Sequence, residues 1–475
     1  MGKRILGILL LILPATIFAQ EKWGLRRCVD YAMQNNISVK QADVQARITA
    51  LQLEQAKFNK IPTASFGTGV GLQFGRSIDP TTNLFTTQSF LSQNYQLQGG
   101  ATIFSFGRLK NAVSVADFNT QAALEDIEKT KNDIALNVAT YYLQVLQAQE
   151  QMNIVSVQIS QTQTQLDNTK KKVDAGSLPE LNLAELEAQL ATDSSNLITA
   201  RTSYEQNILA LKALLNMDMA APFVVETPPV ERIPLDPIAE LQPGDVYQIA
   251  KATQPQQKAN DLRIKGAEKN ILVARSSLYP SFSGFYSLGS NYNNQNQGQI
   301  GFIPVNPPIG KVNIDGTDYQ VYPNQPLNQP IYAKTKYFTQ VGDNFTQSIG
   351  INISVPIFNN GVARIGYKNS KLNLESLKLQ KDLADQTLQS NIYNAYTTAI
   401  ASMEKFNASG RSVESAQKAF DFATKRYEVG LLSTLDLITN QNNLLRAKLQ
   451  QLANQFDYVF KMKVLEFYKG QGIKL

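Results

Sequence analysis

The chain has 475 residues, and its 45 Lys and Arg against 39 Asp and Glu give a formal net charge of only +6. No block of like charge stands out, which argues against a nucleic-acid-binding surface. The chain has no His and one Cys, and it lacks a Walker loop, a G-x-S-x-G elbow and a dinucleotide fingerprint, so we expect no metal site, no cofactor and no catalysis.

Residues 1–19 have the layout of a secretory signal peptide, with a basic start, an apolar run and Ala19 as the expected cleavage point. Gln20 rather than Cys follows, which argues against a lipoprotein anchor. After the signal, no apolar stretch reaches the roughly eighteen residues that a transmembrane helix needs. If the mature chain enters a membrane, we expect it to do so as a β-barrel.

The remaining sequence contains two copies of one unit. An offset of 254 aligns residues 104–107 with 358–361 and continues without a gap for more than a hundred residues. Upstream the offset is 218, so the second copy carries an insertion of 36 residues within about 291–345. This stretch is rich in Asn, Gln, Pro and Tyr and predicts a long external loop.

Each copy has the same predicted order of a helix, two strands and a long helical hairpin. We expect repeat 1 over 20–221, a Pro-rich connector over 222–244 and repeat 2 over 245–475; the connector is either a linker or an irregular belt outside the helices. In the first copy we expect a helix near 24–59, strands near 62–75 and 96–106, and a hairpin 108–216 of helices 108–174 and 179–216. In the second we expect a helix near 245–277, strands near 279–290 and 345–357, and a hairpin 362–469 of helices 362–428 and 433–469.

The predicted strands alternate between apolar residues and small or polar ones. Phe66, Val70 and Leu72 fall on one face of the first strand, and Gly and Ser fall on the other. This pattern fits a membrane barrel with lipid outside and water inside, and strands of about ten residues can cross an apolar band of roughly 25 Å. A soluble sandwich alternates in the same way, so the strands alone leave both open. The smallest membrane barrels have about eight strands, so a membrane barrel here requires several chains, and three would supply twelve strands.

The predicted helix 108–174 contains no Pro and would be on the order of 100 Å long, several times the thickness of a bilayer. It is too polar for lipid, and Val138, Val145 and Met152 follow a heptad that predicts coiled-coil packing. A plain antiparallel coiled-coil protein would have similar helices. A secretory signal and repeated strands of membrane length argue against that interpretation.

Turns at matched positions, Asp174–Pro179 and Glu428–Ser433, should place both hairpin tips at one end. Gly176 and Gly430 can adopt the left-handed conformation that reverses the chain, and Ser433 or Thr434 can cap the next helix.

With two repeats, each of two strands and a long helical hairpin, the mature chain resembles the outer membrane efflux protein family typified by TolC. The most specific local matches are Ile357-Phe358 leading to Gly361, and Tyr427-Glu428-Val429-Gly430 followed by Thr434-Leu435-Asp436. The resemblance implies a mixed α and β membrane protein: a homotrimer with a 12-stranded β-barrel in outer-membrane lipid, four strands per chain, continued by a long coiled-coil α-helical barrel in the periplasm. It also implies a passive exit duct of a tripartite efflux pump or type I secretion system. A periplasmic adaptor (membrane fusion) protein and an inner-membrane pump of RND or ABC type would open it.

The resemblance further implies a gate near the second tip, formed in the family by a Tyr, an Arg and two Asp. Tyr427 and Asp436 match two of these positions, whereas Leu432 replaces the Arg and Thr439 the second Asp. One Asp436 from each chain would still form a carboxylate ring that favours cations. Tyr427 as ordinary coiled-coil packing and Asp436 as a solvated first-turn residue remain alternatives. The implied adaptor contacts are Gly176, Ser177, Leu178, Gly430, Leu431 and Leu432.

Two other functions remain as alternatives. A surface adhesin with a coiled-coil stalk would need a binding head, for which residues 291–345 are the one candidate. A diffusion porin acting alone would not need helices of about 100 Å.

Overall fold

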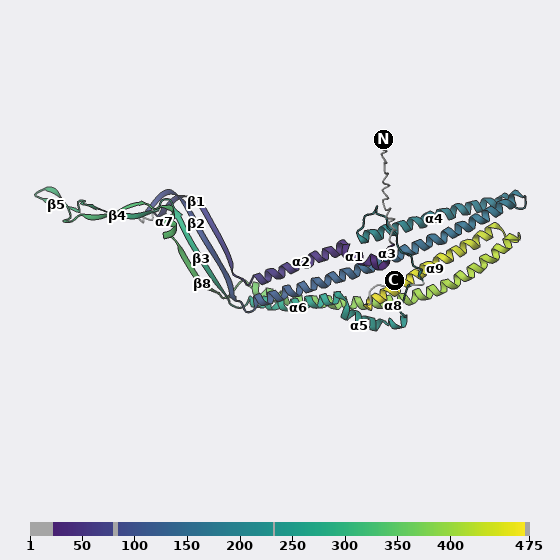
Figure 1. Ribbon diagram of the computed structural model, residues 1–475. Helices are drawn as coiled ribbons and strands as arrows, with labels where there is room; N and C mark the ends of the chain where they lie inside the picture. The colour runs from purple at the N-terminus through teal and green to yellow at the C-terminus, as the bar shows by residue number, and fades with distance from the viewer. Residues whose placement is uncertain (1–21, 79–83, 231–232, 471–475) are drawn as a thin grey trace, which may run out of the picture. The chain divides into compact units, whose positions relative to one another are not determined.

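The structure is a computed structural model that describes residues 22–78, 84–230 and 233–470 (Figure 1). It divides into two compact units. The helical unit takes in the described residues up to Leu51, then Ala116–Ala267 and Leu372 onward, and the sheet unit takes in Gln52–Val115 and Glu268–Lys371. The expected signal peptide, residues 1–19, lies outside the described residues.

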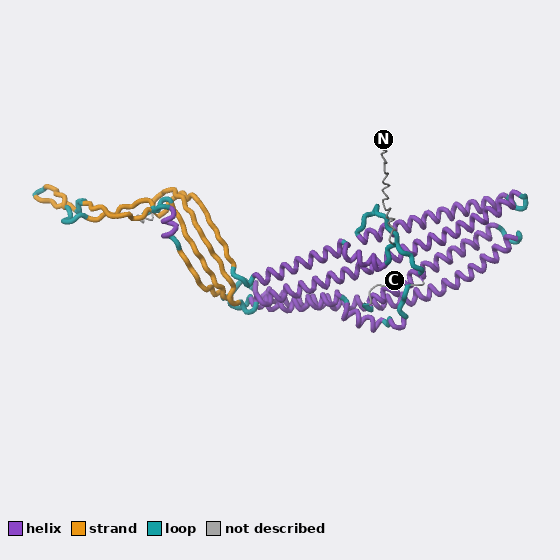
Figure 2. The backbone as a smooth tube through the Cα atoms, in the orientation of Figure 1, coloured by secondary structure: helices purple, strands orange, loops and turns teal. Residues whose placement is uncertain are grey.

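Most of the described chain is helical (Figure 2). The α-helices are α1 (Leu25–Asn35), α2 (Ile37–Phe58), α3 (Arg108–Asp174), α4 (Glu180–Leu215), α5 (Pro243–Thr253), α6 (Pro255–Ser276), α7 (Tyr337–Asp343), α8 (Val362–Glu428) and α9 (Thr434–Tyr468). Helices α3 and α8 have 67 residues each and the bounds that the sequence predicted. No Pro interrupts them, and glycines with positive φ, such as Gly107 and Gly176, lie just outside their ends.

The helix expected near 24–59 is two helices, so this prediction was wrong in detail. The Asn36 side chain donates from Nδ2 to the Leu214 carbonyl oxygen at 2.8 Å, and its Oδ1 accepts from the Ser38 amide at 2.8 Å. Asn36 therefore ends α1 and caps α2. The helix expected near 245–277 is likewise divided, because Pro255 has no N–H for a continuous helix and begins α6 instead.

Four antiparallel strands form the main sheet in the order β1-β2-β3-β8. They are β1 (Thr63–Ile78), β2 (Phe85–Phe104), β3 (Ser281–Asn293) and β8 (Thr346–Ser354). Leu97 lies opposite both Phe66 and Leu288, and Tyr286 lies opposite Ile349, so the apolar rows of the four strands share one face. In the paired stretches the opposite face consists mainly of Gly, Ser, Thr, Asn and Gln and has no charged side chain.

The second strand and the insertion differ from the sequence prediction. Strand β2 begins at Phe85 rather than near 96, because residues 85–95 also pair with β1. The insertion is not an irregular loop: it contains α7 and two two-stranded sheets. Their strands are β4 (Gln297–Val305) with β7 (Leu327–Lys334), and β5 (Gly310–Ile314) with β6 (Thr317–Val321). Asp315 and Gly316 both have positive φ and form the tight turn that an Asp-Gly pair favours.

The main sheet has two open edges, since β1 and β8 have no further partner strand among the described residues. Strand β3 runs past the end of its pairing with β8, and the Gln340 side chain covers this extension. Its amide accepts from the Asn293 N–H and donates to the Asn293 carbonyl at 3.0 Å. A side chain thus replaces the missing strand there, whereas the outer edges of β1 and β8 stay available for pairing.

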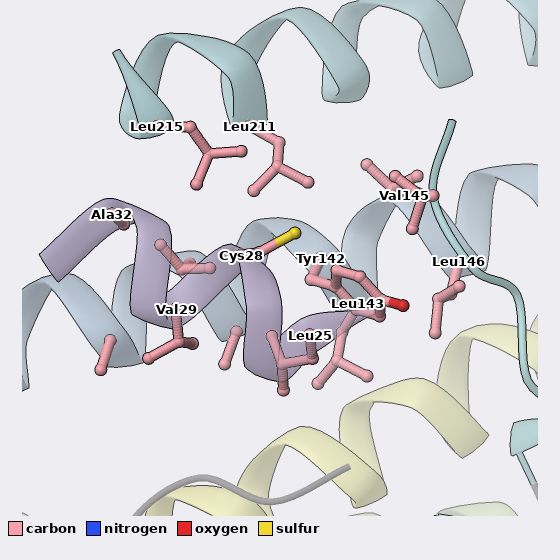
Figure 3. Close-up of a cluster of buried hydrophobic side chains, with 14 of the residues drawn as sticks. Leu25, Cys28, Val29, Ala32, Tyr142, Leu143, Val145, Leu146, Leu211 and Leu215 are labelled. Atoms are coloured by element: carbon pink, nitrogen blue, oxygen red, sulfur yellow. The ribbon is translucent and has the colours of Figure 1, made fainter. Parts of the chain in front are cut away.

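A buried apolar core joins α1, α3 and α4 in the helical unit (Figure 3). Cys28 of α1 lies among Tyr142 of α3 and Leu211 and Leu215 of α4. The Tyr142 hydroxyl donates to the Glu226 carbonyl oxygen at 2.6 Å, so its buried polar atom has a partner. The same core includes Leu452, Phe456 and Val459 of α9, which connects it to the second hairpin.

The connector between the two halves packs against the helices as a belt. Its Val225 and Leu241 are buried in apolar clusters, and a short 3-10 helix spans Ile238–Glu240. The buried Lys463 ammonium donates to the Pro234 carbonyl at 2.6 Å and to Glu466 Oε2 at 2.8 Å. A buried ion pair that also holds a backbone carbonyl fixes the path of the connector.

Within the described part of the chain, none of the helices has a segment both apolar and long enough to pass through a lipid bilayer.

Gly99 of β2 should not tolerate a side chain. A Cβ there would lie 1.9 Å from the Thr63 carbonyl oxygen, so we expect Gly99→Ala to destabilise the protein by about 1–3 kcal/mol. At Gly71 of β1 nothing lies within 4 Å of the added Cβ, so Gly71→Ala should change stability by less than about 0.5 kcal/mol. Thermal unfolding followed by circular dichroism compares them, and equal midpoints would contradict the close approach.

The stability of the core should fall at alkaline pH. Burial raises the pKa of the Cys28 thiol from 9.0 to about 12, which Arg27 offsets only in part. A raised pKa in the folded state stabilises the fold fully below pH 9, and this contribution is lost as the pH rises from 9 toward 12, by up to about 1.4 kcal/mol per pH unit. Urea unfolding at pH 8 and pH 10 tests this. Cys28→Ala should lose stability less steeply over that interval, and an identical slope would refute the assignment.

Candidate functional site at the hairpin tips

The turn between α3 and α4 is closed by two backbone hydrogen bonds. Gly176 has φ 70°, and its N–H donates to the Val173 carbonyl at 2.9 Å. The Ser177 N–H donates to the Lys172 carbonyl at 2.8 Å. This pair of bonds is a Schellman motif, which needs the left-handed conformation that glycine adopts without strain. Gly176 and Ser177 are exposed and Leu178 is half-buried.

The turn between α8 and α9 repeats the motif. Gly430 has φ 78° and donates to the Tyr427 carbonyl at 3.0 Å, while the Leu431 N–H donates to the Arg426 carbonyl at 2.8 Å. Gly430 and Leu431 are exposed, whereas Leu432 is half-buried against an apolar cluster. Both turns lie at the same end of the helical unit (Figure 1).

Tyr427 connects the two hairpins and does not face solvent. Its ring is buried in an apolar cluster of α8 and α9, and its hydroxyl lies 2.8 Å from Thr169 Oγ1 of α3 and 3.5 Å from Thr434 Oγ1. The Lys172 ammonium lies over the ring at 5.7 Å from its centroid and donates to the Glu428 carbonyl at 3.2 Å. Packing accounts for the ring of Tyr427, and the hydroxyl adds a polar contact between hairpins.

Asp436 occupies the first turn of α9 and forms a reciprocal cap with Ser433. Ser433 Oγ accepts from the Asp436 N–H at 3.1 Å and donates to Asp436 Oδ2 at 2.7 Å. Ser433 is therefore the N-cap residue, and the positive end of the helix dipole favours the carboxylate. The Asp436 side chain is exposed to solvent.

Thr439 lies one turn after Asp436 on the same face of α9. It is exposed, and its hydroxyl donates to the Leu435 carbonyl at 2.8 Å. Thr439 and Asp436 thus stand together, while Leu432 packs inward where the implied pattern has an Arg.

Two polar contacts of α3 were missed in the sequence. Thr169 meets Tyr427, and Thr162 belongs to a buried cluster of polar side chains. A signal for both exists, because the heptad row through Ala148 and Val155 continues at Thr162 and Thr169, so that apolar positions become polar near the tip.

The sequence profile described as outer membrane efflux protein matches residues 29–217 and 246–461. Outer membrane protein TolC of Escherichia coli K12 is 22% identical over 342 residues, covering 71% of this chain and 62% of TolC, so the chain spans less than two thirds of that relative. The pyoverdine export outer membrane protein OpmQ of Pseudomonas putida is 22% identical over 482 residues, covering 94% of this chain and 85% of OpmQ. The CmeC outer membrane channel of Campylobacter jejuni shares the fold, with a TM-score of 0.71 at 18% identity over 95% of this chain and 86% of CmeC.

The hydroxyl contact between Tyr427 and Thr169 should be measurable as a coupling energy. Tyr427→Phe and Thr169→Val each remove one partner, and the coupling in a double-mutant cycle should be about 0.5–1.5 kcal/mol. Urea unfolding of the two single variants and the double variant gives this value. Fully additive losses would mean that the two hydroxyls do not stabilise each other.

Proposed function

This chain belongs to the outer membrane efflux protein family, and from that membership we propose that three copies form a passive exit duct for an efflux or secretion machine. Its location is the outer membrane, with the helices in the periplasm. The family is one of outer-membrane channels and not of enzymes.

The observation that carries the proposal is the main sheet, with one apolar face, one uncharged polar face and two open edges. Hydrocarbon does not tolerate unpaired backbone groups, so the outer edges of β1 and β8 must be completed by other copies. Three copies supply twelve strands. In such a barrel the apolar face meets lipid and the uncharged face lines a water-filled lumen that rejects neither cations nor anions.

Aromatic side chains at both ends of the apolar face support the membrane placement. Phe104 lies near Phe282 at one end of the strands, and Tyr95 contacts Tyr337 toward the other. Tyr95 and Phe104 are nine positions apart on β2, which is about 30 Å along a strand and about 23 Å in height at a 40° tilt. That height matches the apolar band between the aromatic girdles of outer-membrane barrels, about 25 Å.

The hairpin tips suit the entrance of the duct. The two turns expose Gly176, Ser177, Gly430 and Leu431, which we assign to contact with a periplasmic adaptor protein and, through it, an inner-membrane pump of RND or ABC type. Asp436 and Thr439 stand on one exposed face of α9, where three chains would form a ring of carboxylates and a ring of hydroxyls. Opening would require the hairpins to separate at the contact between Tyr427 and Thr169.

The adhesin alternative would need a binding head in the insertion. The strands β5 and β6 of the insertion are exposed throughout and form a two-stranded sheet, which is at most marginally stable in isolation. This argues against a compact head.

Conductance in planar bilayers tests the duct and its gate. We expect the purified protein to conduct ions and Asp436→Ala to lower its preference for cations, because a carboxylate ring at a narrow mouth concentrates cations. Thr439→Asp adds a second carboxylate one turn away and should raise that preference.

The matched control is Asp421→Ala, which removes an exposed carboxylate on α8, two turns before the end of that helix, and should leave selectivity unchanged. Absence of any conductance would refute the duct. Conductance with the same selectivity in all variants would refute only the assignment of Asp436 to the gate.

A further inference from the structure

We propose that a buried polar layer around Asp193 forms a second closure between the two hairpins, one heptad behind the Tyr427 contact, and that Asp193 is a positioning residue for opening. The inference rests on the proposed function, since opening matters only for a duct. We call this set the Asp193 layer; it consists of Thr162 of α3, Gln189 and Asp193 of α4, and Gln441 and Asn442 of α9.

Asp193 fixes the direction of a hydrogen-bond chain through three helices. Its side chain is 0% exposed, and Oδ2 lies 2.6 Å from Thr162 Oγ1. A carboxylate only accepts hydrogen bonds, so the Thr162 hydroxyl donates to Asp193 and its oxygen is left to accept. Gln441 Nε2 of α9 donates to that oxygen at 2.9 Å. The Asp193 carboxylate on α4 thus makes the Thr162 hydroxyl of α3 the acceptor for the Gln441 amide of α9.

A second branch reaches α9 through Gln189. The Gln189 amide nitrogen donates to Asp193 Oδ1 at 2.7 Å and to Asn442 Oδ1 at 3.2 Å, which uses both of its hydrogens. Asn442 Nδ2 donates back to Gln189 Oε1 at 3.1 Å. The structure gives Asp193 hydrogen bonds to Thr162 and Gln189, so it acts on α9 through these two side chains.

The layer lies in series with the tip contact. Thr162 precedes Thr169 by one heptad on α3, and Gln441 follows Thr434 by one heptad on α9. Because α3 and α9 run in opposite directions, the Asp193 layer and the Tyr427 contact are neighbouring polar layers of one interface, the seam between α3 and the second hairpin. Separation at the tip therefore meets this layer next.

Farther from the turns, the interface between α3 and α9 first opens into grooves and then becomes apolar. First come two grooves of about 570 Å³ and 160 Å³, both with Ile154 of α3 and Lys448 of α9 in their walls. The larger groove is also lined by connector residues 227–230 and reaches Leu452 and Phe456. Then comes the apolar core, where Leu452 and Phe456 of α9 meet α3. Exposing apolar surface to water is unfavourable, whereas polar groups can exchange their partners for water. We therefore expect α3 and α9 to stay in contact at the apolar core and to separate at the polar layers.

Two hydrogen-bonding groups are left unused, one in the layer on Gln441 and one beside it on Gln158, which lies one turn before Thr162 on α3 and lines the smaller groove. Gln441 Oε1 and Gln158 Nε2 are buried and have no hydrogen-bond partner among the described residues. Such groups lose the hydration that they would have in solvent, so the closed layer is weaker than its hydrogen bonds alone suggest. Water entering on separation would satisfy both atoms. The hydrogen bonds of the layer thus fix the register of the two hairpins, and the two groups without partners lower the free energy needed to separate them.

Modification of an introduced thiol can report separation at the layer. We place Gln158→Cys in the full-length protein as the parent and measure its reaction with N-ethylmaleimide at pH 7.5 by mass spectrometry. Cys28, buried in the core, is an internal reference in the same molecule, and burial raises the pKa of its thiol to about 12. Opening at the layer modifies only the introduced thiol, whereas global unfolding modifies both.

Three variants of this parent distinguish a releasable layer from simple packing. Asp193→Ala leaves the Thr162 and Gln189 donors without their acceptor and should speed modification about tenfold. Asp193→Asn should stay near the parent rate, because Gln189 and Asn442 can both turn their amides and keep every bond. Thr162→Val with Asp193→Leu and Gln441→Leu makes three of the five positions apolar, leaves Gln189 and Asn442 bonded to each other, and should slow modification about tenfold.

The control is Asp167→Ala, which removes an exposed carboxylate of α3 between Thr162 and Thr169 and should not change the rate. An unchanged rate in Asp193→Ala, or an apolar variant as reactive as the parent, would overturn the proposal. So would modification of Cys28 in step with the introduced thiol. If Asp193→Ala does not fold, the Asn and apolar variants still decide. Bilayer conductance of the unsubstituted protein separately tests the duct, so the two proposals can fail independently.

Discussion

The apolar core around Tyr142 is the contact on which the helical unit depends. Residues of α1, of both helices of the first hairpin, of α9 and of the connector pack in this core. The Tyr142 hydroxyl donates a hydrogen bond to the Glu226 carbonyl. The hydrophobic effect is not directional, so burial in this core does not fix how the two hairpins meet at their tips. Polar contacts do so instead. The two hairpins meet there through a tyrosine hydroxyl, a lysine and the Asp193 layer, and water can replace these polar contacts.

The sheet unit follows a different constraint, which is the need to pair every backbone group. Its register brings the apolar residues of four strands onto one face, and Gln340 closes the one place where β3 outruns β8. The outer edges of β1 and β8 remain for other copies. A chain of this kind is incomplete alone in lipid, which is why the proposed duct is an assembly.

The two long helices were predictable because local rules set their ends. Gly107 and Gly176 lie just outside the two ends of α3, and no Pro falls inside it. Its heptad pattern is visible in the sequence of this helix alone. The break at Asn36 was not predictable in the same way, because its side chain bonds to Leu214, 178 residues away. The Asp-Gly turn of the insertion carried a local hairpin signal that the polar composition of the segment obscured.

At the tips, the sequence by itself determined the turns, an N-cap at Ser433 or Thr434, and the positions of Tyr427 and Asp436, because Gly, Ser and heptad spacing act over a few residues. The structure shows that Ser433 is the cap. The sequence did not determine that the Tyr427 ring is buried with its hydroxyl on Thr169, or that Asp193 joins three helices. Those contacts bring together residues far apart in the chain, and a polar residue in a heptad row looks the same whether its partner is water or another helix. Only the packing of the two hairpins against each other decided between them, because burial removes the water and leaves each polar group dependent on the neighbours that the fold supplies.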